Sequence, residues 1–263
     1  MPRVSLRSPD AQVVAIEGAS GAGKTSVAGE LARRLDAVLI PEAFDRLGRR
    51  RSLRFRDRPG LAEIERALLA EEGRRWTEAT AHRRAGRPVV LDTGTTGPLT
   101  YSWGVREGID SRWDVVSEVL RQTRRLRSLH GWGLPDLTFY LDVSEDVADA
   151  RAARSPTDHP APLRERHRRV GRFERFLYER EFPRRLPGRF GCVAGEGSPR
   201  EVASGIRDRL ERLGPVPPVT APELDRFLDL FEGSGPSTGA RRTSESGRNS
   251  PTGRARRSPH PNS

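Results

Sequence analysis

Residues 18–25 read GASGAGKT and have the residue types and spacing to bind the phosphate groups of a nucleotide. They match the pattern G-x-x-x-x-G-K-[ST], in which backbone amides surround phosphate oxygens, the lysine reaches the outer phosphates and the hydroxyl ligates Mg²⁺. An apolar stretch precedes the pattern and an amphipathic stretch follows it, so the start of a helix would also face the anion. The predicted binding loop, as opposed to a plain glycine-rich turn, comprises Gly18, Ala19, Ser20, Gly21, Ala22, Gly23, Lys24, Thr25 and Ser26.

Lys24 is the only lysine in a chain with 47 Lys+Arg residues, so every other basic side chain of this set is arginine. An ammonium group is a compact charge on a flexible stem, whereas a guanidinium group is a broad planar fork that would crowd a loop wrapped around a phosphate. The single lysine is therefore consistent with a phosphate contact at this position.

Two acidic residues follow predicted strands and are candidates for the chemistry next to the loop. Asp92 ends the run VVLD and would hold Mg²⁺ together with Thr25, or orient the acceptor; the alternative is a cap on the following turn. Glu42 would act as base for an acceptor hydroxyl; the alternative is a solvated loop acid. Ligands of α/β proteins bind at the carboxyl ends of strands, so we expect both acids near the loop.

Three arginines are candidates for contacts to the transferred phosphoryl group or to the acceptor. Arg151 and Arg154 lie three residues apart on one face of a predicted helix, within a lid at 151–168, and either would stabilise phosphoryl charge. Arg74 would contact a polar or anionic acceptor; the alternative is a surface position on its helix.

The apolar pattern places these residues in an alternating α/β chain. Short apolar runs predict strands at 13–16, 37–40, 89–92, 137–143 and 190–194. Helical spacing predicts helices at 25–35, 61–84, 113–129, 146–153, 163–182 and 199–213. The alternation predicts a three-layer α/β/α fold of the P-loop NTPase type, with a five-stranded parallel sheet and a helical lid.

The composition changes at Gly214, which predicts a boundary between a P-loop domain and appended segments. We expect the kinase-like domain at 1–213, a proline-rich linker at 214–221 and a short amphipathic helix at 222–232. The helix would dock on this domain or on a partner. Residues 233–263, rich in Arg, Ser, Gly and Pro, are expected to be disordered.

Charge and cysteine content narrow the partners and the compartment. The net charge of +11 suits phosphorylated ligands, nucleic acid or anionic membranes. Arginine in place of lysine throughout the chain is, however, typical of a GC-rich genome and a solvated surface, so we expect no nucleic-acid partner. No apolar run or signal peptide indicates a membrane, and the single Cys192 suits a reducing compartment. The expected location is the cytoplasm, and a homodimer is compatible with the sequence.

Several spaced segments resemble the thymidylate kinase and deoxynucleoside kinase group of P-loop phosphotransferases, over about residues 13–213. IEGASGAGKTS resembles the group's F-E-G-x-x-G-x-G-K-T-T opening, with Glu17 on its glutamate. LLAEEGRRW resembles its L-L-F-x-A-x-R helix, with Arg74 on the arginine, and PEAF falls where the group carries E-P, with Glu42 on the deoxynucleoside kinase glutamate. PDLTFYLDVSEDVADAR is the closest match and places Asp142 and Arg151 on the group's aspartate and arginine.

The chain departs from that group where the acceptor would bind. Thr93 stands where thymidylate kinases carry arginine, Ala70 where an aromatic residue stacks on the base, and Ser20 where the thymidylate kinase loop carries an acid. The resemblance therefore supports the ATP half of the site better than the acceptor half.

The combined prediction is a kinase that uses ATP and Mg²⁺ to transfer the γ-phosphate to a small acceptor, a nucleoside or a nucleotide. The alternative is an NTP-binding switch or accessory ATPase whose output is a protein contact through residues 222–232 or the tail. A third hypothesis is a basic nucleic-acid binder.

Overall fold

The structure, a computed structural model, describes residues 11–47, 55–154 and 161–233. The described residues up to Gly233 belong to one compact unit. The predicted disordered tail after Gly233 lies outside the described residues, as do the middle of the predicted lid, residues 155–160, and the first ten residues.

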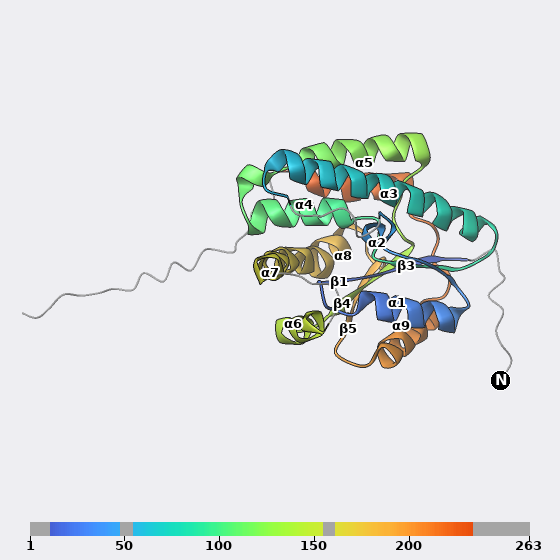
Figure 1. Cartoon of the computed structure of the whole chain (residues 1–263). Coiled ribbons are helices and arrows are strands. Elements are labelled where there is room, and N and C mark those ends of the chain that lie inside the picture. The colour runs from blue at the N-terminus through green and yellow to red at the C-terminus, as the bar shows by residue number, and fades with distance from the viewer. Residues whose placement is uncertain (1–10, 48–54, 155–160, 234–263) are drawn as a thin grey trace, which may run out of the picture. The chain divides into compact units, whose positions relative to one another are not determined.

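A parallel sheet of five strands forms the centre of the fold (Figure 1). The strand order is β2-β3-β1-β4-β5, and all neighbouring strands pair in parallel. The strands are β1 (Val13–Gly18), β2 (Val38–Ile40), β3 (Val89–Asp92), β4 (Leu137–Asp142) and β5 (Phe190–Ala194). They are continuous apolar runs because both faces of a parallel sheet are covered. The prediction of a five-stranded parallel α/β fold is confirmed.

Helices cover both faces of this sheet, which gives three layers (Figure 1). The helices are α1 (Lys24–Leu35), α2 (Ala43–Arg46), α3 (Arg58–Arg84), α4 (Gly97–Gly108), α5 (Val116–His130), α6 (Glu145–Ala153), α7 (Ala161–Phe176), α8 (Phe182–Arg185), α9 (Pro199–Leu213) and α10 (Ala221–Leu228). Short turns of other helix types are η1 (Ser111–Trp113), η2 (Leu177–Glu181) and η3 (Asp229–Phe231).

Alternate residues of β1 contribute to two separate hydrophobic cores. Val14 and Ile16 pack in the core that includes α1 and α9, whereas Val13 and Ala15 pack in the core that includes α3, α4 and α5. This alternation follows from the two-residue period of a strand. The parallel register of β1 and β3 pairs Ile16 with Asp92, so the carboxyl ends of the two strands lie side by side.

The structure contains helix α4 at Gly97–Gly108, where the sequence analysis predicted no helix. Gly104 and Gly108 of α4 face α7 closely: a Cβ at Gly104 would lie 2.7 Å from Val170 Cγ1, and one at Gly108 would lie 2.8 Å from the ring of Phe173. The glycines that weaken the helical signal in the sequence therefore allow the two helices to approach each other. The single helix expected at 163–182 is in fact α7 followed by the π-helical turn η2.

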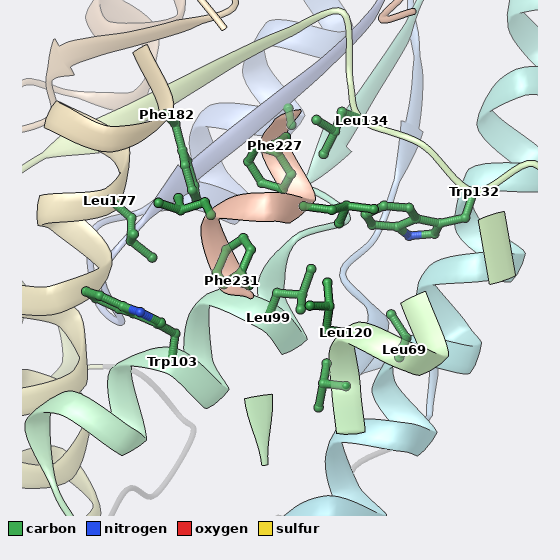
Figure 2. Close-up of a cluster of buried hydrophobic side chains, with 14 of the residues drawn as sticks. Leu69, Leu99, Trp103, Leu120, Trp132, Leu134, Leu177, Phe182, Phe227 and Phe231 are labelled. Atoms are coloured by element: carbon green, nitrogen blue, oxygen red, sulfur yellow. The ribbon is translucent and has the colours of Figure 1, made fainter. Parts of the chain in front are cut away.

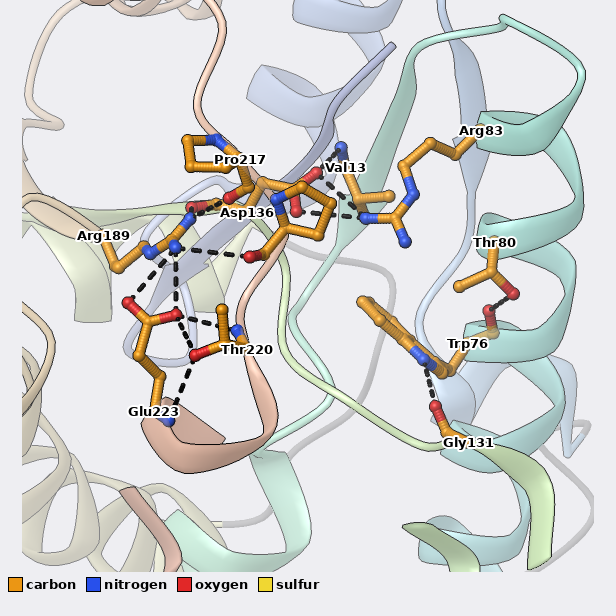
Figure 3. Close-up of polar contacts among 11 residues, drawn as sticks. Val13, Trp76, Thr80, Arg83, Gly131, Asp136, Arg189, Pro217, Thr220 and Glu223 are labelled. Carbon is orange, nitrogen blue, oxygen red and sulfur yellow. Dashed lines mark hydrogen bonds and ion pairs between the residues drawn. The ribbon is translucent and has the colours of Figure 1, made fainter. Parts of the chain in front are cut away.

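The predicted amphipathic helix at 222–232 is α10 with η3, and it packs in the core of the same compact unit (Figure 2). Phe227 and Phe231 are 0% and 2% exposed, and the rings of Phe227 and Phe182 lie 4.8 Å apart. The preceding linker is held by Arg189, which donates to the carbonyl oxygen of Pro217 and pairs with Glu223 at 3.2 Å (Figure 3). The segment thus docks in cis, which was one of the two sequence-based expectations.

None of the helices in the described part of the chain combines the length and the apolar character that a membrane span requires.

Candidate active site

The loop between β1 and α1 has the backbone conformation of a phosphate-binding loop. Gly21 and Gly23 adopt φ angles of 82° and 93°, which favour glycine, and a Cβ at Gly21 would also clash with the carbonyl oxygen of Ala148 in α6. Lys24 Nζ donates to the carbonyl oxygens of Gly18 at 2.9 Å and Ala19 at 3.2 Å. These contacts close the loop and hold the single ammonium group inside it.

The predicted loop residues line two adjacent cavities. All of them except Ala19 line a cavity of about 1110 Å³. Ala19 lines a smaller cavity of about 140 Å³ next to α6 and α7, which Ser20 also borders. The predicted loop residues other than Ala19 therefore lie together along the larger cavity.

Asp92 does not itself line the cavity, but it lies beside Thr25, which does, so the two side chains could share a magnesium ion. Asp92 is 2% exposed; burial raises the pKa of its carboxyl group, and a hydrogen bond with the Thr25 side chain and the charge of Lys24 oppose that rise. Asp92 Oδ1 has no hydrogen-bond partner among the described residues. A buried, unpartnered carboxylate oxygen beside a hydroxyl fits a hard cation that prefers oxygen ligands. No group of three His, Cys, Asp or Glu residues in the described ranges could hold a metal, so most ligands would be phosphate and water oxygens.

Glu42 lies at the cavity wall and is oriented by Thr93. Thr93 Oγ1 donates to Glu42 Oε2 at 3.3 Å, and Thr93 has a φ of 67°, which is rare for a β-branched residue. Burial raises the pKa of Glu42, the charges of Asp92 and Asp45 raise it further, and Lys24 lowers it. The strained Thr93 thus holds an acid with a raised pKa next to the loop, as strained residues do at functional sites.

Glu17 is a buried acid that the sequence matched to the kinase group without assigning it a role. It is 5% exposed, and its Oε1 accepts a hydrogen bond from the amide of Gly94 at 2.8 Å. Burial raises its pKa, and the charge of Lys24 and a hydrogen bond with Tyr178 oppose that rise. Glu17 therefore joins the end of β1 to the turn after β3, below the loop.

Arg74, predicted to contact the acceptor, lies on the exposed side of α3 away from the cavity, whereas its neighbour Arg75 is buried. Arg74 pairs with Glu71 at 2.6 Å, is 60% exposed and does not line the cavity. Arg75 is 0% exposed, pairs with Glu72 at 2.5 Å and donates to the carbonyl oxygens of Asp92 and Thr93, both at 2.7 Å. Arg75 thus positions the end of β3, where the strand-end acid and the strained threonine lie.

The two predicted lid arginines have different positions. Arg151 lines the cavity and donates to the carbonyl oxygens of Ala22 at 3.0 Å and Gly195 at 2.9 Å, so it joins the loop to the turn after β5. Arg154 donates to Ala150 of its own helix at 3.1 Å, is exposed and does not line the cavity. The structure brings Arg151 to the loop but not Arg154.

Beyond Glu42 the cavity extends between α3, α4 and α7, where its walls are mostly apolar. Phe55, Ile64, Leu68, Tyr101 and Val170 line this part. We refer to it as the acceptor half, and to the part lined by the loop as the nucleotide half.

The acceptor half contains acids that the sequence prediction missed: the buried Glu65 and Glu72 of α3 and the half-buried Glu174 of α7. Glu65 is 1% exposed, and burial raises its pKa well above the usual range. Burial raises the pKa of both Glu72 and Glu174 to about 7. The available signal was helical phase, because Glu65 and Glu72 share the buried stripe of α3 with Leu69.

Comparisons with known proteins agree with the phosphate-binding fold. A family model described as an AAA domain matches residues 13–179. A deoxyadenosine kinase from M. mycoides with bound dATP has a similar structure, with a TM-score of 0.56 and 14% identity over 76% of this chain and 99% of that chain. The same kinase with the products dCMP and a flexible dCDP has a TM-score of 0.51 and 13% identity over 77% and 100% of the two chains. None of the curated proteins compared with the chain matches it.

Proposed function

Since the chain belongs to the AAA domain family and has the fold of a deoxyadenosine kinase, we propose that it is a P-loop kinase that transfers the γ-phosphate of ATP to a hydroxyl group of a small acceptor. The observation that carries this proposal is that the loop and the acceptor half belong to one cavity of about 1110 Å³. Pockets for one ligand are typically about 300–1,000 Å³. The cavity is therefore large enough for a nucleotide together with a second molecule.

In this proposal the nucleotide half holds the phosphates and neutralises their charge. The loop amides and Lys24 bind the β- and γ-phosphates, as the contacts of Lys24 inside the loop suggest. Thr25 and Asp92 would hold Mg²⁺, which would neutralise charge on the phosphates. Arg151 stabilises the transferring group from the outer edge of the loop, next to Ala22.

Glu42 takes the proton of the acceptor hydroxyl. Its raised pKa brings it closer to the range in which a carboxylate is an effective base at neutral pH. Thr93 holds its Oε2 in place. Arg74 and Arg154 have no part in the proposed site, because Arg74 pairs with Glu71, Arg154 donates to its own helix, and neither contacts a residue of the loop.

The acceptor class follows from the fold relatives and is narrowed in the next subsection. The similar kinase structures are described with dATP, dCMP and dCDP, so a nucleoside or a compound of similar size is proposed as acceptor. The groups named above all come from the described residues of one chain, so the reaction does not require a homodimer. We place it in the cytoplasm.

Radiolabel transfer tests the proposal directly. The full chain is incubated with [γ-³²P]ATP, Mg²⁺ and a panel of nucleosides, nucleotides and small alcohols. Label is expected in a product only when an acceptor is present, and it should be absent with Lys24→Ala. Hydrolysis of ATP at one rate with and without every acceptor would refute the kinase.

The alternative of an NTP-driven switch loses one of its two proposed contact segments. The apolar side chains of α10 and η3 are buried in the chain's own core, so they are not available to a partner in this structure. A contact through the tail after Gly233 concerns residues outside the described part. Acceptor-independent hydrolysis in the assay above would favour this alternative.

A further inference from the structure

The acceptor half contains a buried carboxylate whose second oxygen has no partner. Glu65 lines the cavity and is 1% exposed, and its Oε2 makes no hydrogen bond in the described part of the chain. Burying an unpaired polar group is costly, and buried polar side chains are nearly always hydrogen-bonded. An unpaired oxygen that borders a cavity is therefore available to accept a hydrogen bond from a ligand that enters it.

A second carboxyl group lies across the cavity. Glu174 of α7 also lines it, and Thr100 Oγ1 donates to Glu174 Oε1 at 3.4 Å. The charge of Glu174 acts on Glu65 and raises its pKa. Two neighbouring carboxyl groups from different helices oppose each other's ionisation, so both are ionised together most readily when a cation lies between them.

The cations nearby are engaged elsewhere. The guanidinium of Arg75 pairs with Glu72, and Lys24 donates to carbonyl oxygens of the loop. The guanidinium of Arg166 lies over the ring of Phe55, 4.3 Å from its centroid, and forms a hydrogen bond with Tyr101. Glu65 pairs with none of these three side chains. His167 also lines the cavity, and its ring centroid lies 6.4 Å from that of Tyr101.

We propose that Glu65 and Glu174 bind a protonated amino group of the acceptor, so that the substrate is an amine-bearing alcohol, such as an amino sugar or an aminonucleoside. This inference rests on the proposed kinase function and names the substrate class of the same cavity. The apolar side chains of Phe55, Ile64 and Leu68 contact the body of the molecule, while Glu42 receives the hydroxyl proton. A phosphorylated acceptor is excluded, because its charge would lie against the two carboxylates.

Matched sets of acceptors test the substrate class. The full chain with ATP and Mg²⁺ is assayed with two sets of acceptors, and each set contains an amine, its N-acetyl derivative, the hydroxyl analogue and a phosphate ester of one skeleton. The first set is glucosamine, N-acetylglucosamine, glucose and glucose 6-phosphate. The second set is 3′-amino-3′-deoxyadenosine, its N-acetyl derivative, adenosine and AMP. A charge-assisted hydrogen bond contributes about 1.5–3 kcal/mol, so kcat/KM for the amine is expected to exceed that for its neutral analogue by about tenfold or more.

The outcomes separate the two proposals. Preference for the amine within a set supports both. Transfer to neutral or phosphorylated members at an equal or higher rate overturns the amine site and leaves the kinase standing. Transfer to no member at all overturns both.

Glu65→Gln and its control assign the effect to the residue. Glu65→Gln keeps the side-chain volume and is expected to raise KM for the amine about tenfold while KM for ATP is unchanged. The matched control is Glu63→Gln, an exposed residue two positions away on α3, which should alter neither constant. Thermal unfolding shows whether Glu65→Gln is folded. If it is not, Glu174→Gln replaces it in the test and is expected to raise KM for the amine in the same way. An unchanged ratio of amine to neutral activity in both variants would show that the carboxyl pair is only structural.

Discussion

The two halves of the cavity are built on different principles. In the nucleotide half the cationic side chains contact the chain itself: Lys24 binds carbonyl oxygens of its own loop, and Arg151 binds those of Ala22 and Gly195. In the acceptor half the carboxylates of Glu65 and Glu174 face a cavity, and Glu65 Oε2 is unpaired among the described residues. The cationic side chains of the nucleotide half are thus held by the chain itself, whereas the acceptor half presents carboxyl oxygens to the cavity.

Arg75 connects the two halves, and its loss should have the largest effect on stability. Arg75→Met leaves the buried Glu72 without its partner and removes two bonds to the end of β3. Removing one partner of a buried ion pair costs about 3–5 kcal/mol, so chemical denaturation should show a loss of this size. The exposed neighbour Arg74→Met should change stability by less than about 0.5 kcal/mol. Equal effects of the two variants would contradict the structural role given to Arg75.

Replacement of Lys24 should lower the rate of phosphoryl transfer through the nucleotide half, whichever acceptor is used. Lys24→Ala is expected to lower kcat by about 10²–10³-fold with any acceptor, because one charge-stabilising donor is lost. Lys24→Arg should restore little activity, because a guanidinium fork crowds the loop. The control is Arg33→Ala, exposed on the same helix α1. Full activity of Lys24→Arg would show that the loop does not discriminate between the two cations.

Glu42 lies at the boundary between the halves and should affect the chemical step. Glu42→Gln is expected to lower kcat by about 10²–10⁴-fold while KM for ATP changes little. The acid limb of the kcat profile against pH should disappear in the variant, since Glu42 must lose its proton to act as base. A retained limb would assign that titration to another group.

The acid groups of the acceptor half should make the unliganded chain less stable as the pH rises. Burial raises the pKa of Glu174 to about 7, with Glu17 raising it further and Lys24 and Thr100 opposing. Because the folded state holds this proton more tightly than the unfolded state, the stabilisation is full below pH 4.5 and is lost as the pH approaches 7.

The size of that effect can be measured by thermal unfolding between pH 5 and pH 8. Glu174→Gln should reduce the loss of unfolding free energy between pH 5 and pH 8 by on the order of 1–3 kcal/mol. The exposed control Glu63→Gln should leave it unchanged. An identical slope in wild type and Glu174→Gln would contradict the raised pKa.

The nucleotide half could be predicted from sequence because its chemistry is local. The residues from Gly18 to Ser26 are contiguous, and the five apolar runs that carry the sheet are continuous in the chain. Asp92 and Glu42 were found because strand ends in a parallel sheet meet at one edge.

The acceptor half could not be predicted because it depends on helix phase and on packing between distant segments. Arg74 and Arg75 are adjacent on α3 and therefore point to different sides of the helix. The sequence resemblance selected Arg74, which is exposed, whereas Arg75 is buried. Helix α4 was missed because Gly104 and Gly108 weaken the helical pattern while allowing α7 to approach. Glu65 and Glu174 belong to helices far apart in the sequence, so the sequence alone offered no sign of the pair.

The central claim, that one cavity joins a phosphate-binding loop to an acceptor, is tested most directly by acceptor-dependent ADP formation. We predict that the full chain with ATP and Mg²⁺ forms ADP faster when an amine-bearing alcohol is added, with an equal amount of phosphorylated product, and that Lys24→Ala abolishes both. ADP formation at the same rate with and without every acceptor, and without any phosphorylated product, would contradict the claim.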